Sequence, residues 1–444
     1  MTEKKKMILN AHEKPNGGKW FVLSLQHVFA MFGATVLVPF LTGLPISVAL
    51  FTSGIGTLIY ILCTKAKVPV YLGSSFAFIV PIQLIVGMSD QSNNTDLYFG
   101  SVLTGLLVVG IVYIIISFII KLIGTNWIDK LLPPVIIGPM IAIIGFSLAS
   151  VAVESSGLVA GGDWRQITTA LVSFLIVVIV AIKAKGFFKI IPFLCGIIGG
   201  YIFASIVGIV DFSGIVQTVK EPQSWFKIPE FMFLGFKDHE IMVLGSQITF
   251  YKLNFTAALS LAPIALVTAC EHIGDHAVLS EITGQNYLKD PGLHKTLLGD
   301  GLATAFAAMV GGPANTTYGE NTSVVGMTKI GSVWVTGLAA VMAVCLSFIN
   351  LFVQIVASIP PAVMGGISMI LYGFIGLNGI KVLIENKVDF SKTRNMIIAS
   401  VMLVLGLGGA VVGFGFFTMY GMALAAVVGI ILNLVLPHEK EDNN

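Results

Sequence analysis

The chain has 444 residues, of which 56% are hydrophobic and only 11% are charged. So large an apolar fraction excludes an ordinary soluble domain and indicates a protein that spans a membrane. The net charge of +2 is not gathered into a basic cluster, so we expect no nucleic-acid partner. The four cysteines have no metal-ligand spacing, and we expect neither a metal site nor a disulfide framework.

Apolar segments recur along the whole chain. Crossing roughly 30 Å of hydrocarbon takes about 20 helical residues, and fourteen segments of the chain meet or approach that length. They begin near residues 20, 45, 67, 99, 131, 165, 187, 255, 297, 314, 331, 361, 395 and 417. The segments near 67, 297 and 314 are short or are interrupted by glycine and polar residues. We predict an all-α polytopic membrane protein with fourteen transmembrane segments.

Basic residues indicate the orientation of these segments. With the N-terminus inside, 20 of the 25 lysines and arginines lie on the cytoplasmic side, as the positive-inside rule requires. Four of the other five lie in a long outer loop at residues 211–254. The N-terminal basic run, residues 4–6, lacks the apolar stretch and cleavage site of a secretory signal. We expect both termini in the cytoplasm and a location in the plasma membrane, which is the inner membrane of a bacterium.

Two polar motifs occur twice in the same order. The pair Gln26-His27 resembles Glu271-His272, and the segment GSSFAF at 73–78 resembles NTTYGE at 315–320. From the histidine to the first aromatic residue of the second motif, the distances are 49 and 46 residues. The copies would lie in spans 1 and 8, so each repeat holds seven spans. An odd number of spans makes the two repeats face opposite ways, which is common in secondary transporters.

The third and tenth spans carry residues that break helices. Pro69 and Pro313 each precede an extended stretch, which is followed by serine or threonine pairs able to cap a new helix start. The new helices would point their N–H groups and positive dipole ends at the bilayer centre. Such ends favour a carbonyl oxygen or an anion as their partner.

Two acidic residues lie in segments that should be within the bilayer, Glu271 in 255–273 and Glu320 in 314–328. A carboxylate at that depth costs about 3 kcal/mol, and it normally faces a cavity, a partner or a substrate. When ionised, carboxylates accept hydrogen bonds from N–H groups, and Phe76 offers an aromatic face to a flat ring. A planar molecule with alternating N–H and C=O groups, such as uracil, fits this combination better than a sugar, an amino acid or an inorganic anion.

Five stretches in both halves resemble the bacterial uracil permeases of the nucleobase/ascorbate transporter family, which are uracil:proton symporters. They are SLQHVFAMFGATVLVP (24–39), YLGSSFAF (71–78), EHIG (271–274), DPGLHKTLLGDGLAT (290–304) and NTTYGEN (315–321). The resemblance implies a core domain from spans 1–4 and 8–11, a gate domain from spans 5–7 and 12–14, and short β-strands in the broken spans 3 and 10. It also implies a homodimer through the gate domain.

The resemblance places the substrate site residue by residue. It implies that Glu271 and Glu320 bind substrate with their carboxylates and that Phe76 and Gly319 do so with their backbone amides. It adds a gate-side tyrosine, Tyr372, and the internal repeat makes Tyr318, the counterpart of Phe76, a further candidate.

The resemblance also fixes the boundaries that we expect. The chain divides into a cytoplasmic tail (1–19), a first seven-span repeat (20–210), an extracellular loop (211–254), a second seven-span repeat (255–436) and a cytoplasmic tail (437–444).

The chain departs from the family pattern at two positions. The family signature runs from Glu320 to Lys329 but has glycine where this chain has Ser323. Asp275 stands four residues after Glu271, where a well-known uracil permease has histidine, and one helical turn brings the two carboxylates to the same face. Joint ionisation of two neighbouring carboxylates is unfavourable. We therefore assign Glu271 and Asp275 to proton coupling, with protons as the coupling ion and no cofactor.

The sequence thus predicts a transporter that imports uracil by proton symport, with one domain moving against the other to give alternating access. The alternatives are a proton symporter for a purine, such as xanthine or uric acid, and an anion transporter of the same architecture for sulfate or bicarbonate. An enzyme is not expected, because no nucleophile and base, metal set or paired aspartate motif stands out. His27 and His272 are expected to brace neighbouring helices, and Asp300 is expected to be a loop or helix-end charge.

Overall fold

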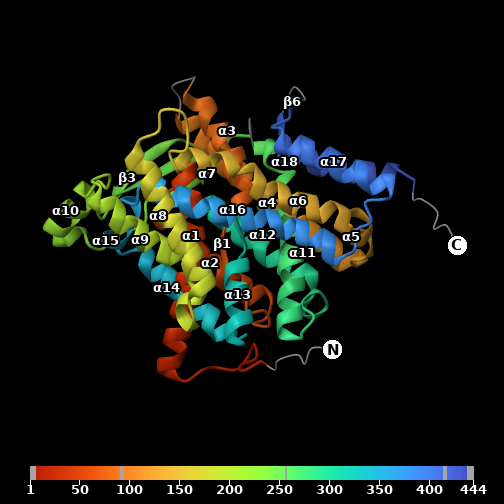
Figure 1. Ribbon diagram of the computed structural model, residues 1–444, viewed down its shortest axis with the longest axis horizontal. Helices are drawn as coiled ribbons and strands as arrows, with labels where there is room; N and C mark the ends of the chain where they lie inside the picture. The colour runs from red at the N-terminus through yellow and green to blue at the C-terminus, as the bar shows by residue number, and fades with distance from the viewer. Residues whose placement is uncertain (1–6, 91–94, 256–257, 414–417, 438–444) are drawn as a thin grey trace.

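The computed structural model of the chain describes residues 7–90, 95–255, 258–413 and 418–437. Helices make up most of the molecule, and three small β-sheets lie among them and at its edges (Figure 1).

Residues up to 252 form the following elements. They are α1 (Gly17–Thr42), α2 (Ile46–Cys63), β1 (Leu72–Ser74), η1 (Phe76–Phe78), α3 (Ile79–Asp90), α4 (Thr95–Ile123), α5 (Asn126–Leu131), α6 (Pro134–Ser147), α7 (Ala149–Ser155), α8 (Trp164–Lys183), η2 (Gly186–Ile190), α9 (Pro192–Ile206), α10 (Ser213–Lys220), η3 (Pro222–Ser224), β2 (Met232–Gly235), β3 (His239–Val243) and β4 (Ser246–Lys252).

The rest of the chain likewise consists mainly of helices with a few short strands. Its elements are η4 (Ala258–Ser260), α11 (Ile264–Thr283), η5 (Leu288–Gly292), α12 (Leu293–Val310), β5 (Asn315–Thr317), α13 (Gly319–Thr328), α14 (Val333–Ser347), α15 (Asn350–Ala357), α16 (Pro361–Glu385), α17 (Thr393–Leu407), β6 (Val411–Gly413), β7 (Thr418–Tyr420) and α18 (Gly421–Val435).

Several helices suit a lipid environment. Among the described residues, six helical segments are long and apolar enough to cross a membrane, and five further apolar helices have 10–17 residues. On α8, Leu175, Ile179 and Ile182 repeat at helical spacing and are 51%, 52% and 74% exposed. A stripe of exposed leucine and isoleucine on one helix face is unfavourable in water and fits hydrocarbon.

The two broken spans meet at the centre of the molecule. Strand β1 pairs antiparallel with β5, with Gly73 opposite Thr316, and β1 lies in the middle of Figure 1. The pairing extends past the strands, because the N–H of Ser75 donates to the carbonyl of Ala314 at 2.8 Å and that of Tyr318 to the carbonyl of Tyr71 at 3.1 Å. The two short strands expected after Pro69 and Pro313 are therefore present.

A new helix begins directly after each strand, η1 at Phe76 and α13 at Gly319. The expected serine or threonine caps are wrong, because Ser75 and Tyr318 occupy the cap positions and neither makes a side-chain cap bond. Strand pairing rather than capping fixes the backbone at both positions.

The helices pack in two sets. In the first set, α4 packs on α12, α2 packs on α12 and α14, and α1 packs on α14. In the second set, α6 packs on α16 and α17, α8 packs on α9 and α16, and α17 packs on α18. Each set contains helices from both halves of the chain. The second set holds α6 and α16 very close together.

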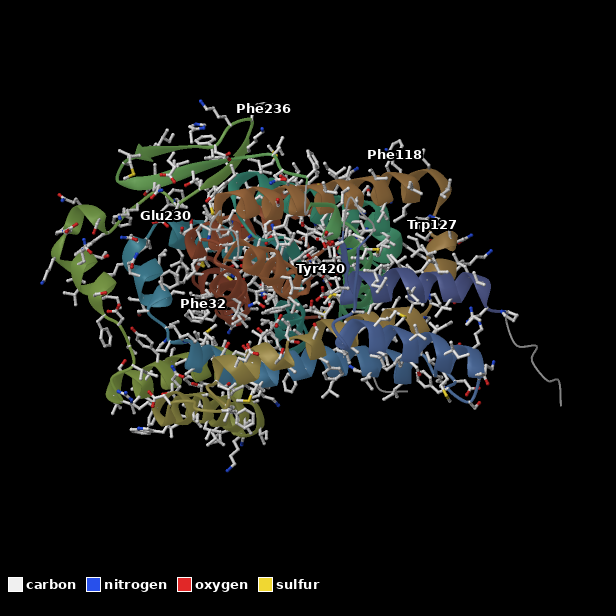
Figure 2. The ribbon with its side chains drawn as sticks, turned by 90° about the horizontal axis from the view of Figure 1, so that it is seen from above. Phe32, Phe118, Trp127, Glu230, Phe236 and Tyr420 are labelled. Carbon is white, nitrogen blue, oxygen red and sulfur yellow. The ribbon has the colours of Figure 1, made fainter. Side chains whose placement is uncertain are left out.

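Two regions that we expected to be a loop and a tail contain helix, strand or β-bridge structure. Residues 211–254, expected as a loop, contain α10 and a three-stranded sheet of order β2-β4-β3. This sheet covers one side of the molecule next to α4, and its Phe236 projects outward (Figure 2). On the N-terminal segment, Leu9 forms a parallel bridge with Ile330.

Glycines set the distance between α6 and α16. A Cβ atom on Gly379 would lie 2.3 Å from the backbone nitrogen of Ala142 and 2.4 Å from the carbonyl oxygen of Gly138. Backbone atoms cannot move aside as a flexible side chain can, so this contact requires glycine.

We predict that Gly379→Ala destabilises the protein by about 1–3 kcal/mol because it forces the two helices apart. Gly373→Ala is the matched control on the same helix, since its added Cβ would meet nothing within 4 Å. Thermal unfolding of the purified protein in detergent measures the difference. Equal melting temperatures for the two variants would contradict this account of the contact.

Candidate functional site

A cavity of about 480 Å³ opens beside the crossing of β1 and β5. Its wall comes from α1, η1, α6, α8, η2, α9, α11, β5, α13 and α16, so both halves of the chain contribute. Six of the seven predicted site residues line it: Phe76, Glu271, Asp275, Tyr318, Gly319 and Glu320.

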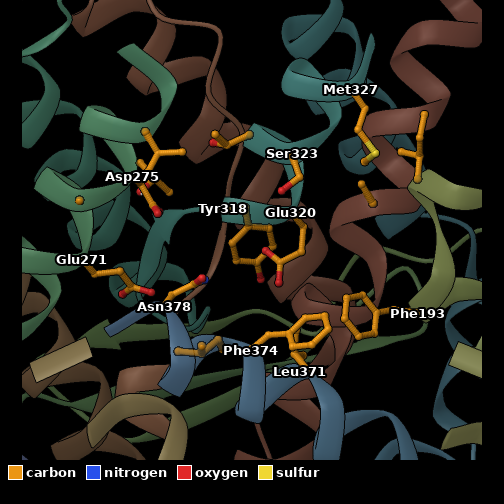
Figure 3. Close-up of a pocket in the computed structure, with 18 of the residues that line it drawn as sticks. Phe193, Glu271, Asp275, Tyr318, Glu320, Ser323, Met327, Leu371, Phe374 and Asn378 are labelled. Carbon is orange, nitrogen blue, oxygen red and sulfur yellow. The ribbon is translucent and has the colours of Figure 1, made fainter. Parts of the chain in front are cut away.

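The two glutamates reach the cavity from different elements. Glu271 lies in the middle of α11, and Glu320 is the second residue of α13. Both project into the space drawn in Figure 3, and both are only partly buried. The Oε2 atom of Glu271 is itself buried and has no hydrogen-bond partner among the described residues. An acceptor in that state is available to an N–H donor of a bound molecule.

Asp275 lies one turn beyond Glu271 on the same helix. The hydroxyl of Thr317 donates to its Oδ2 at 2.8 Å, which ties α11 to strand β5. A Cβ atom on Gly319 would lie 3.9 Å from Oδ1, the other carboxylate oxygen of Asp275. Asp275 therefore borders the start of α13 as well as the cavity.

The three aromatic residues predicted for the site differ in how they lie relative to the cavity. Phe76 lines the cavity, and the ring of Tyr372 lies against it with a centroid distance of 6.0 Å and an interplanar angle of 74°. Tyr372 is 2% exposed and is not among the lining residues, so it supports Phe76 from behind. Tyr318 joins the strands, because its hydroxyl donates to the carbonyl of Ser74 at 3.0 Å.

Histidines brace the helices around the site, as expected. The side-chain amide of Asn321, the third residue of α13, donates to the carbonyl of His27 and lies 3.1 Å from its Nδ1. His272 lies 2.7 Å from Asp300 and 2.9 Å from the hydroxyl of Thr296, both on α12. The expectation that Asp300 is a loop or helix-end charge is wrong, since it lies inside α12 and is 0% exposed.

Sequence reasoning missed Asn378, which lines the cavity from α16. In Figure 3 it lies beside Glu271. The signal was available, because an amide in an otherwise apolar span is unusual.

The comparison with known proteins identifies the family. Residues 18–414 match the Permease family. The chain belongs to this family.

Curated relatives extend over almost the whole chain. A protein named uracil permease from Bacillus subtilis (strain 168) is 45% identical, with 99% of this chain and 97% of the relative covered. Others of that name come from Bacillus caldolyticus, with 42% identity and coverage of 97% and 95%, and from Escherichia coli (strain K12), with 39% identity and coverage of 96% and 93%. The expected resemblance is confirmed, and the chain is a multi-pass membrane transporter rather than an enzyme.

Solved structures of other transporters share the fold. The transmembrane domain of the cyanobacterial bicarbonate transporter BicA has a TM-score of 0.60 and 14% identity, covering 96% of this chain and all 100% of that domain. The murine Solute Carrier 26 family member A9 anion transporter has a TM-score of 0.66 and 12% identity, covering 95% of this chain and 69% of that one. At such identities the likeness concerns the fold alone.

We predict that Asn321→Ala destabilises the permease by about 1–3 kcal/mol, because it removes the amide donor to the buried ring nitrogen of His27 and a second hydrogen bond to its carbonyl. Ser323→Ala is the control, since Ser323 lies two residues further on the same helix and faces the cavity (Figure 3). Melting temperatures of the detergent-purified variants give the result. If Asn321→Ala has the same melting temperature as Ser323→Ala and the wild type, the amide of Asn321 does not stabilise the packing of α13 against α1.

Proposed function

We propose that this permease imports uracil by proton symport with alternating access. The observation that carries the proposal is the cavity in which Glu271, Glu320, Phe76 and the start of α13 come together. The relatives named uracil permease support the choice of substrate. Purines such as xanthine remain the alternative within the family.

The proposed architecture follows the repeat in the sequence. Fourteen spans form two inverted repeats of seven, with β1-η1-α3 and β5-α13 as the broken spans 3 and 10. The packing of α1, α2, α4, α12 and α14 supports a core domain, and that of α6, α8, α9, α16, α17 and α18 supports a gate domain. Both termini are cytoplasmic, the protein lies in the inner membrane, and its gate domain forms a homodimer.

Uracil satisfies the groups around the cavity. Its ring N–H groups donate to the carboxylates of Glu271 and Glu320, and its carbonyl oxygens accept from the backbone amides of Phe76 and Gly319. Phe76 covers a face of the ring, with Tyr318 beside it and Tyr372 behind Phe76. Because Glu271 and Glu320 lie on different elements, the two hydrogen-bonding edges of one ring are recognised together.

A proton supplies the driving force. Neutral uracil cannot by itself use the membrane potential, whereas one elementary charge moving through 100 mV is worth about 2.3 kcal/mol, close to fifty-fold accumulation. We assign the proton to Glu271 with the help of Asp275, so that the protonated site crosses with its substrate. No cofactor is required.

We predict that Glu271→Gln and Glu320→Gln each lower uracil affinity by roughly 10- to 100-fold, because a charge-assisted hydrogen bond is lost. The measurement is uptake of radiolabelled uracil into proteoliposomes under an inward proton gradient, with and without a protonophore. Glu281→Gln is the matched control, since Glu281 is an exposed glutamate of the same helix outside the cavity wall. Absence of uracil uptake by correctly folded wild-type protein would overturn the assignment, and uptake of labelled xanthine or of labelled sulfate would then identify the class.

Asp275→Asn tests the coupling role separately. This variant keeps an oxygen that can accept from Thr317 but removes the second ionisable group of the pair. We expect it to exchange labelled for unlabelled uracil across the membrane while its proton-driven accumulation falls by about tenfold or more. Unchanged accumulation would exclude Asp275 from coupling and leave Glu271 as the remaining candidate of the pair.

A further inference from the structure

Three buried polar side chains form a cluster outside the substrate cavity. His272 of α11 lies between Asp300 and Thr296 of α12, and all three are 0% exposed. Its Nδ1 is 2.7 Å from Asp300 Oδ2 and its Nε2 is 2.9 Å from Thr296 Oγ1. None of the three lines the cavity. The binding of uracil described above does not use them.

The threonine hydroxyl has two possible acceptors. It lies 2.9 Å from Nε2 of His272 and 3.1 Å from the carbonyl oxygen of Leu293. With neutral His272, Nδ1–H donates to the Asp300 carboxylate and the hydroxyl donates to Nε2. When a proton is added to Nε2, Nε2–H donates to Thr296 and the hydroxyl turns to Leu293. Both states satisfy His272 and Thr296 with the same positions of the heavy atoms.

We propose that His272, Asp300 and Thr296 form a proton-binding site that takes up and releases a coupling proton next to, but outside, the substrate cavity. The proposal rests on the proposed uracil:proton symport and adds a second proton-binding position to it. The proton comes from water and returns to water, and no other atom is gained or lost.

The groups around the cluster make a proton there responsive to the substrate. The ionisable groups that act electrostatically on Asp300 are Glu271, Asp275 and His276 on α11, Tyr60 on α2 and Tyr113 on α4. The Nδ1–H of His276 donates to the carbonyl of His272 at 2.7 Å, and its Nε2 is hydrogen-bonded to the hydroxyl of Tyr60. These bonds fix the position of the His276 ring, whose centroid lies 3.9 Å from that of His272.

The charges of the nearby carboxylates also act on a proton bound to the cluster. While Glu271 is ionised, its negative charge favours a proton on the cluster by attraction, and this attraction is lost when Glu271 itself carries a proton. Oδ1 of Asp300 has no hydrogen-bond partner among the described residues, which also disfavours a bare carboxylate. The protonation states of Glu271, in the substrate cavity, and of the cluster are thus coupled across α11.

Thr296→Val tests the two-acceptor arrangement while keeping the side chain's shape. The charged form of His272 then loses the acceptor for Nε2–H, and this loss exceeds that of the neutral form because hydrogen bonds to charged groups are stronger. We expect the midpoint of the pH profile of uracil uptake to move to lower pH by about one unit, a tenfold loss of proton affinity. Thr296→Ser, which restores the hydroxyl, should recover the wild-type profile.

Thr336→Val is the matched control. Thr336 is a buried threonine whose hydroxyl donates to the carbonyl three residues earlier, at 3.2 Å, as Thr296 does at 3.1 Å. The control should keep the wild-type midpoint. An unmoved midpoint in Thr296→Val, or an equal shift in Thr336→Val, would overturn the proposal.

Asp300→Asn removes the carboxylate that balances the imidazolium. We expect uracil exchange between the two sides of a proteoliposome to continue while accumulation driven by a proton gradient falls at least tenfold. Wild-type accumulation in this variant, or loss of exchange and accumulation together in folded protein, overturns the proton-site proposal. If Asp300→Asn does not fold, the pH profiles of Thr296→Val and Thr296→Ser decide the question alone. Failure of the wild type to exchange uracil would instead overturn the proposed function.

Discussion

A backbone N–H or C=O that leaves a helix inside a membrane must find a partner within the protein. The chain meets this requirement at the pairing of β1 with β5, and the rest of the site depends on it. Because three residues of each half pair with the other half, both helix breaks are held at one place. The helix starts at Phe76 and Gly319 are therefore directed at the same cavity.

The surrounding side chains maintain this crossing from several directions. Tyr318 reaches across to the carbonyl of Ser74, Thr317 holds Asp275, and Asn321 holds His27. Each bond joins an element of the second broken span to a different helix or strand. The acidic side chains are thus placed by a polar framework that is buried in protein, whereas α8 presents an apolar stripe on its exposed face.

Much of the site could be predicted because membrane burial makes polar residues conspicuous. Glu271, Glu320 and the prolines before each break stood out in apolar segments, and the repeated motif linked Phe76 to Tyr318. Asp300 did not stand out, because glycine and polar neighbours made its segment resemble a helix end. The position of Tyr372 behind Phe76 depends on how α16 turns against α6. No single sequence pattern encodes that rotation, and the sheet at 232–252 was likewise hidden in a region read as a loop.

The crossing also sets the order in which the molecule can be completed. The chain enters the membrane from its N-terminus, and 244 residues separate Ser74 from its partner Tyr318. Until the second half has been synthesised, the polar backbone of β1 lacks its β5 partner at bilayer depth. The first half of the chain is therefore incomplete during biosynthesis and depends on water, lipid headgroups or the insertion machinery to shelter these groups. Neither half of the chain can therefore complete this crossing alone.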